Sequence, residues 1–387
     1  MNRFSCALLL LIMWSKFNTT VAQDTLNSRR DTLVFFGQLS SWGQSNFNHS
    51  PHAQLGGRYI PSINYSIKFQ NNKQIDFEGA ANIVGSIASL PFDTINTDGS
   101  INPYRLWVRY SSRQFELRFG LQKINFGSAS MLRPLMWFDQ IDPRDPLKLT
   151  NGVWGMLGRY YFLNNANLWL WGLYGNNNAR PWDIGKTSRN VPEFGGRYQH
   201  PVSKGEMALS YHFREVDSRN LGNAIPSFTK ISENRIGIDG RFDTKAGLWF
   251  EGTWINKGKN IGSLTNQEIF NVGTDYTFGI GNGINVVFEQ LFFSSDESPF
   301  AFKNNILFSG LSLNYPMGIV DNISTIVYYD WKNRDVYNFV NWNHRFQHLT
   351  FYLMAYWNPD KYSLPQQGNT GSAFAGPGFQ IMFVFNH

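Results

Sequence analysis

Apolar and polar side chains alternate in about eighteen segments of roughly 8–14 residues along this chain. Segments of this length and period are typical of tilted β-strands that cross a hydrocarbon layer, with one face toward lipid and the other toward water. The clearest example is the hairpin 104–122. The apolar face of its first strand comprises Tyr104, Leu106, Val108 and Tyr110, and the polar face carries Arg105, Trp107 and Arg109.

The predicted connections alternate between eight tight turns and nine longer polar loops. The turns are rich in Gly, Pro, Asn and Asp, which hairpins use. We expect them at 71–72, 111–112, 164–165, 201–203, 243–245, 279–282, 315–320 and 343–344. In outer-membrane barrels short turns gather at the periplasmic rim and long loops at the outer rim. An even strand number then leaves both termini in the periplasm.

The pattern predicts an all-β fold, a transmembrane antiparallel up-and-down β-barrel of about eighteen strands, with sixteen as the alternative count. We find no fixed-period repeat and no linker, so residues 23–387 form one predicted domain. The expected strands are 33–42, 54–69, 74–86, 103–111, 113–122, 153–162, 167–175, 193–200, 205–214, 232–243, 245–255, 268–278, 283–293, 305–315, 321–331, 334–342, 346–357 and 374–385.

The last predicted strand gives a second indication. Phe379, Ile381, Phe383 and Phe385 share one of its faces. An aromatic-rich, alternating final strand resembles the segment that barrel-assembly machinery recognises in bacterial outer-membrane proteins. Those proteins most often end on Phe, whereas here Asn386 and His387 follow.

The N-terminus and the composition are typical of an exported protein. Residues 1–22 have a basic start, an apolar run and small residues before a cleavage site after Ala22, which predicts a signal peptide. Cys6, the only cysteine, would be removed with it. Charged residues make up 16%, against about a quarter in a soluble domain. No basic run indicates nucleic acid. We expect a Gram-negative outer-membrane location.

Charged residues of both signs occupy the predicted water-facing side of the wall. A charge on the lipid face costs about 2–4 kcal/mol at the bilayer midplane, so these side chains are expected to point inward. They are Lys68, Arg105, Arg109, Arg118, Arg159, Arg197, Arg214, Arg235 and Arg241, with Asp76, Glu78, Glu116, Glu193, Glu206, Asp239, Glu251, Asp275 and Glu289. One interpretation is that ion pairs brace the wall. The other is that Arg105, Arg109, Arg118 and Arg159, with Glu116 alone nearby, favour anionic solutes.

The loop 123–152 is the longest connection and the best candidate site. Its prolines and large apolar residues predict an ordered loop that folds inward. It then presents charges of both signs at a narrowing of the lumen, although it would equally serve as a plug or latch. The predicted pore residues are Arg105, Arg109, Glu116, Arg118, Lys123, Arg133, Asp139, Asp142, Arg144, Asp145 and Arg159.

Several tryptophans near strand ends or loops have two interpretations. Interfacial aromatic girdles explain most of them. Carbohydrate stacking is the alternative, strongest for Trp137 and Trp182. The set comprises Trp42, Trp137, Trp182, Trp342 and Trp357.

The chain resembles the outer-membrane porin-like barrels related to the alginate-export family, as seen in Bacteroidota. The residues that carry this resemblance are the segment 119–127 (FGLQKINFG), then Arg133-Pro134 and the segment 142–146 (DPRDP). The resemblance implies an eighteen-stranded porin whose constriction is built by this loop and facing arginines. It does not imply that alginate is carried.

No catalytic motif stands out, and we expect neither an enzyme nor a cofactor. The sequence has no G-x-S-x-G, H-E-x-x-H or Walker motif, and a metal pair at His49 and His52 is a minor alternative. We expect a passive channel for small hydrophilic solutes, including anions and oligosaccharides. Its other expected partners are outer-membrane lipid, lipopolysaccharide and the assembly machinery, and homo-oligomerisation stays open. The alternative is a non-conducting surface barrel that binds or exports polysaccharide, of the capsule-assembly type.

Overall fold

A computed structural model of the chain describes residues 31–47, 52–89, 95–219, 221–222, 225–360 and 374–387. The segment Asp31–His387 forms one compact unit. The predicted signal peptide, its cleavage site, Cys6 and His49 lie outside the described residues.

Eighteen long strands form the wall of this unit, and each predicted strand overlaps one of them. They are β1 (Thr32–Asn46), β2 (His52–Lys68), β3 (Gln74–Ser89), β4 (Ile95–Ser111), β5 (Phe115–Gln122), β6 (Val153–Tyr161), β7 (Asn167–Leu173), β9 (Glu193–Val202), β10 (Gly205–Asp217), β11 (Ile231–Asp243), β12 (Gly247–Lys257), β13 (Asn266–Phe278), β14 (Ile284–Asp296), β15 (Asn305–Pro316), β16 (Asp321–Asp330), β17 (Asp335–Arg345), β18 (Leu349–Trp357) and β19 (Pro377–Asn386).

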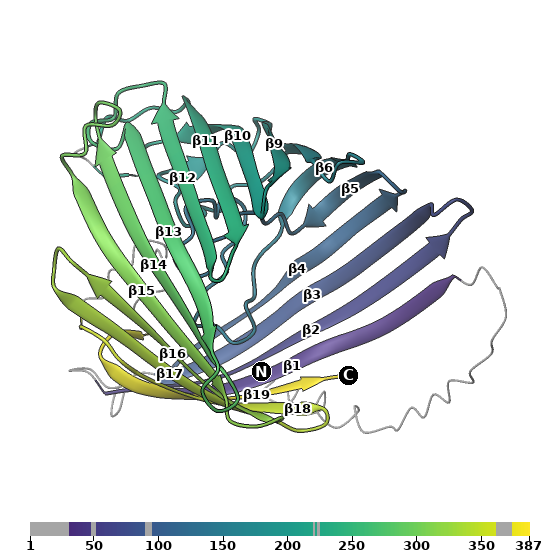
Figure 1. Cartoon of the computed structure of the whole chain (residues 1–387), viewed down its shortest axis with the longest axis vertical. Coiled ribbons are helices and arrows are strands. Elements are labelled where there is room, and N and C mark those ends of the chain that lie inside the picture. Colours follow the sequence, from purple (N-terminus) through teal and green to yellow (C-terminus); the bar gives the residue numbers. More distant parts are fainter. Residues whose placement is uncertain (1–30, 48–51, 90–94, 220, 223–224, 361–373) are drawn as a thin grey trace, which may run out of the picture. The chain divides into compact units, whose positions relative to one another are not determined.

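The wall strands follow one another in sequence order and close into a barrel. Each pairs antiparallel with its neighbours, and β19 pairs with β1 from Gln38↔Asn386 to Asn46↔Gly378 (Figure 1). A further strand, β8 (Lys186–Thr187), lies in the connection between β7 and β9 and pairs with the end of β10. The prediction of a closed, antiparallel, eighteen-stranded barrel is therefore confirmed.

The predicted alternation of faces also holds along the strands. In β10 the side chains of Leu209 and Tyr211 are exposed, whereas the alternating residues Ser210 and His212 are buried. In β19 Phe383 is exposed and Val384 is buried. The apolar face thus lies on the outside of the barrel and the polar face on the inside. Among the described residues, no helix is long and apolar enough to cross a membrane.

Three details differ from the predictions. The strand β4 begins at Ile95 rather than at 103, because its inward residues before Tyr104 are Asn, Asp and Ser, which read as a loop in the sequence. The turn predicted at 343–344 lies at 346–348, because β17 continues to Arg345. Tyr104 is turned inward, because a register shift opposite Ala80 and Ala81 bulges β4 at this residue.

Candidate functional site: a lumen narrowed by two inward loops

The loop 123–152 crosses the interior of the barrel. One part, which includes Ile124 and Trp137, forms a buried apolar cluster with Leu157 of β6 and Trp171 of β7. The residues around Met131, which lie between Ile124 and Trp137 in the sequence, pack in a second cluster against side chains of β12 to β18. The prediction that this loop is ordered and folds inward is thus confirmed by its burial.

Two glycines permit close packing near the loop. Gly120 of β5 has a φ of 121°, and a Cβ there would collide with the carbonyl oxygen of Leu106 on the neighbouring strand β4. On β11, a Cβ at Gly237 would lie 2.5 Å from Leu135 and 3.0 Å from Trp137 of the loop. The wall therefore makes room for the loop at this position.

Two buried carboxylates of the opposite wall bind the backbone of the loop. Glu289 of β14 accepts hydrogen bonds from the amides of Ser130 (2.6 Å), Met131 (3.1 Å) and Leu132 (2.6 Å). Successive backbone N–H groups that converge in this way form an anion-binding nest. The nest fixes the central part of the loop to the far side of the lumen.

Glu251 of β12 makes a second attachment of the same kind. Its carboxylate accepts hydrogen bonds from the amides of Ala129 (2.7 Å) and Leu135 (3.2 Å). A Cβ at Gly127 would overlap this carboxylate. Because buried amides and carboxylates are costly without partners, each side satisfies the other.

Within the loop, Arg133 and Asp139 form an ion pair of 2.8 Å and are 5% and 1% exposed. Both side chains brace the loop, and neither lines the main cavity described below. This differs from the expectation that they present their charges where the lumen is narrowest. The reason is that the loop folds around its own polar groups, as the hydrogen bond of 2.6 Å from Arg133 to the Asn125 side chain shows.

The later residues of the loop do line the cavity. Arg144 pairs with Asp142 at 2.6 Å, and its guanidinium lies 4.5 Å from the ring centroid of Phe374. Burial raises the pKa of Asp145, although its carboxylate accepts hydrogen bonds from the amides of Leu147 and Leu149.

Lys123 is half-buried at the start of the loop. Burial lowers the pKa of this lysine, while the charge of Asp139 acts in the opposite direction.

The predicted arginine cluster forms on β4, β5 and β6. Glu116 lies 3.2 Å from Arg118, 3.4 Å from Arg159 and 3.7 Å from Arg109. Arg109 also pairs with Asp76 at 2.8 Å. Arg105 binds backbone carbonyl groups, including that of Thr150 at 2.9 Å. Arg109, Arg118 and Arg159 therefore share two carboxylates in ion pairs. With Glu78, whose charge acts on Arg105 and Arg118, three carboxylates face four arginines, which leaves one positive charge in excess.

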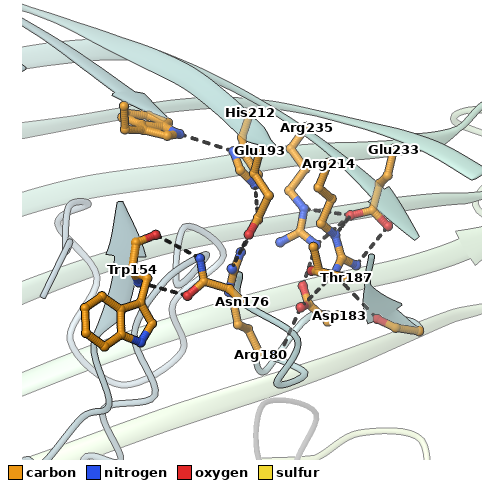
Figure 2. Close-up of polar contacts among 12 residues, drawn as sticks. Trp154, Asn176, Arg180, Asp183, Thr187, Glu193, His212, Arg214, Glu233 and Arg235 are labelled. Atoms are coloured by element: carbon orange, nitrogen blue, oxygen red, sulfur yellow. Dashed lines mark hydrogen bonds and ion pairs between the residues drawn. The ribbon is translucent and has the colours of Figure 1, made fainter. Parts of the chain in front are cut away.

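A second connection, 174–192, also turns into the barrel, and the sequence analysis singled out only its Trp182. Its Asp183 lies between Arg214 and Arg235 on the inner wall, and Glu233 pairs with the same two arginines (Figure 2). All four side chains have 0% exposure.

Arg180 in the same connection is held by Glu193 of β9, with nitrogen–oxygen distances of 2.8 and 2.9 Å. Glu193 also contacts His212 at 3.1 Å (Figure 2). Burial acts to lower the pKa of Arg180, but the charge of Glu193 outweighs it, so this pKa is raised. The only sequence signal was four charged residues, Arg180, Asp183, Lys186 and Arg189, within an Asn- and Pro-rich loop.

The two loops leave a cavity of about 800 Å³ beside the wall of β1 to β4, β18 and β19. Arg58 of β2 lines this cavity, and its guanidinium lies 5.7 Å from the ring centroid of Trp42. Its Nε atom is buried without a hydrogen-bond partner among the described residues. Asp142 and Asp145 line the loop side of the cavity. Sequence reasoning missed Arg58, because it stands alone in a strand with few charges.

The tryptophans fall into different environments. Trp137 and Trp182 are 0% and 4% exposed, so their ring faces are not available for carbohydrate stacking. Trp182 instead donates a hydrogen bond of 2.8 Å to the carbonyl of Arg133. Trp357 is 51% exposed at the end of β18, and Trp42 lies inside the barrel.

No protein-family model matches the chain, and no curated protein matches its sequence. Solved porin structures are similar to it. OccK7 (OpdD) of Pseudomonas aeruginosa has a TM-score of 0.55 at 10% identity, over 92% of this chain and 98% of that chain. OccAB1 of Acinetobacter baumannii has a TM-score of 0.53 at 9% identity, over 92% and 96%. Salmonella typhi OmpF, in complex with daunomycin, has a TM-score of 0.50 at 7% identity, over 92% and 97%. At these identities the similarity shows the fold, which is that of a porin barrel.

Proposed function

We propose that this protein is an outer-membrane porin through which small hydrophilic solutes diffuse without an energy source. The observation that carries the proposal is the loop 123–152, whose backbone is hydrogen-bonded to Glu251 and Glu289 of the opposite wall. This loop narrows the lumen of an eighteen-stranded barrel and leaves a cavity of about 800 Å³. Barrels of 16–18 strands are wide enough to hold an aqueous channel. An inward loop that is fixed to the opposite wall turns such a channel into a filter for size.

Charge supplies the second part of the filter. Arg58 on the wall faces a cavity whose loop side carries Asp142, Arg144 and Asp145, so solutes meet charges of both signs. The arginine cluster on β4, β5 and β6 adds positive charge on the side of the loop 123–152 that faces the short turn 112–114. We infer a preference for small anions over cations of the same size.

Several finer assignments belong to the same proposal. We propose relation to the alginate-export barrels of Bacteroidota, removal of the signal peptide after Ala22, and insertion by barrel-assembly machinery among lipopolysaccharide. Within this proposal Arg133 and Asp139 have a bracing role, and Lys123, Asp142, Arg144 and Asp145 remain constriction residues. The oligomeric state stays open, and the proposal includes no enzymatic step.

One observation favours a second candidate, a non-conducting barrel that binds polysaccharide. Both inward loops are fixed by buried ion pairs and hydrogen bonds, such as those of Asp183 and Glu289, and together they occupy much of the lumen. If the remaining cavity does not continue through the barrel, the protein carries no current.

Single-channel recording in planar bilayers separates the two candidates. A porin gives steady conductance steps in potassium chloride, and a salt gradient gives a reversal potential of the sign expected for chloride preference. Arg58→Gln should reduce that preference, whereas Lys332→Gln, which removes an exposed charge from the 331–334 connection, should leave it unchanged. Absence of current from folded, heat-modifiable protein supports the binding barrel instead.

A further inference from the structure

A second cavity of about 340 Å³ adjoins the main one and has a different chemistry. Its volume falls within the range of about 300–1,000 Å³ that small-molecule sites have. Asn82, Gln140, Asn151 and Arg180 line both cavities, so the two are neighbours. Side-chain amides predominate around the second cavity: Asn82, Asn102, Gln140, Asn151, Asn176, Asn177 and Asn178.

These amides come from three separate parts of the chain. Asn82 and Asn102 are paired on β3 and β4, Gln140 and Asn151 belong to the loop 123–152, and the remaining three to the connection 174–192. The Asn151 side chain donates to the Gln140 side-chain oxygen at 3.3 Å, which orients both. The side-chain oxygen of Asn82 is buried without a hydrogen-bond partner among the described residues. A buried acceptor of this kind is satisfied by a bound molecule or water.

The charge balance of this cavity distinguishes it from the main one. Among the residues that the structure describes, Arg180 is the single ionisable group that lines it, and Glu193 already binds both terminal nitrogens of that guanidinium. Leu121, Phe138 and Val153 contribute apolar surface. The lining therefore offers paired donors and acceptors beside apolar groups, and no free charge.

On this side of the barrel, part of β4 has a neighbouring strand on one edge only, which gives solutes access to the second cavity. The pairing of β4 with β5 covers only Leu106 to Ser111, so residues 95–105 of β4 pair with β3 alone among the described residues. Residues 95–103 are exposed on both faces. Asn102 and Pro103 line the second cavity together with Gly152, which lies just beyond the last pair of β5 with β6, Gln122↔Val153.

We propose that this cavity is a binding subsite for a neutral saccharide. Hydroxyl groups both donate and accept hydrogen bonds, as side-chain amides do, and the C–H face of a sugar ring packs on apolar groups. A carboxylate or ammonium ligand finds no free counter-charge here. The inference rests on the proposed function, because a solute reaches the subsite through the lumen or its mouth.

Sucrose is the probe, added to channels in planar bilayers after their conductance has been recorded without sugar. We expect sucrose to interrupt the current saturably, whereas a polyethylene glycol of similar size lowers it only in proportion to bulk conductivity. Asn82→Ala with Asn102→Ala should raise the half-blocking sucrose concentration about tenfold, since two hydrogen bonds are lost. Asn285→Ala, a change of a half-buried amide beside the 279–283 turn, is the matched control.

The outcomes separate the two proposals. Absence of any current from folded protein overturns the porin proposal. Normal current with no saturable sucrose block, equal block by the polymer, or block that the double variant does not weaken overturns the saccharide subsite alone. Stronger block by sodium gluconate than by sucrose also overturns it, in favour of an anion site. If the double variant does not fold, Asn102→Ala alone, on the exposed part of β4, should shift the block in the same direction by less.

Discussion

The inner face of β9 to β14 and the inner face of β1 to β3 carry similar residue types in different environments. On the first, Arg214 and Arg235 have 0% side-chain exposure, and each pairs with two carboxylates. On the second, Arg58 is half-buried, lines the main cavity, and has a buried Nε atom without a partner. The difference is that the inward loops pack against the first face and leave the second face open.

This contrast shows that an inward arginine has no fixed role in a barrel of this kind. Where a loop covers it, its charge is matched by carboxylates and holds the loop in place. Where the loops leave space, its charge remains available to solutes. The packing of the loops therefore decides which wall charges are structural and which face solutes.

The largest effect is expected from releasing the loop 123–152. Glu251→Ala with Glu289→Ala removes both carboxylates that bind the loop backbone. The freed amides then favour water, so the loop should leave its place and the single-channel conductance should rise several-fold. Glu206→Ala, at the exposed end of β10, is the control. Unchanged conductance in the double variant would show that apolar packing alone holds the loop.

The next largest effect is expected at Asp183. Asp183→Ala leaves Arg214 and Arg235 buried with Glu233 as their remaining carboxylate partner, and breaking a buried pair costs about 3–5 kcal/mol. Arg58→Ala on the open face should change the free energy of unfolding by less than about 1 kcal/mol. Urea unfolding in lipid vesicles measures both. Equal destabilisation by the two variants would contradict the contrast between the faces.

A pair of glycines tests packing without any change in charge. Gly237→Ala places a methyl group against Leu135 and Trp137, and overpacking of this kind costs about 1–3 kcal/mol. Gly57→Ala on β2 meets its nearest atom at 3.9 Å and should be nearly neutral. Heat-modifiable gel migration ranks the two variants. If Gly57→Ala is the less stable of the two, the loop does not pack on β11 as described.

The smallest effect concerns pH. Because burial raises the pKa of Asp145, the folded chain binds this proton more tightly than the unfolded chain. The contribution of Asp145 to the free energy of unfolding is therefore greatest at low pH. It declines as the pH rises from 3.8, the ordinary pKa of an aspartate, through the raised pKa. Asp145→Asn should remove this part of the pH dependence in urea unfolding. Parallel profiles for the variant and the unchanged protein would argue against burial of Asp145.

The candidate site was predicted in part. Prolines and apolar residues in the loop 123–152 predicted an ordered inward loop, because such residues are unfavourable in a solvated tip. The partners of the loop could not be predicted, since Glu251 and Glu289 lie more than a hundred residues away and look like other inward charges. Carbohydrate stacking, the alternative interpretation of Trp137 and Trp182, does not fit their burial, which the sequence does not show because two loops produce it.

The sequence by itself determined the wall. Apolar and polar residues alternate along each strand, so each strand has one apolar face. Few arrangements pair every strand and also turn every apolar face toward lipid, so the fold and the strand number followed from local patterns. Tertiary structure alone decided the interior. The pairing of Asp183 with Arg214 and Arg235, and the openness around Arg58, depend on where two loops pack, and loop packing depends on contacts that sequence neighbours do not encode.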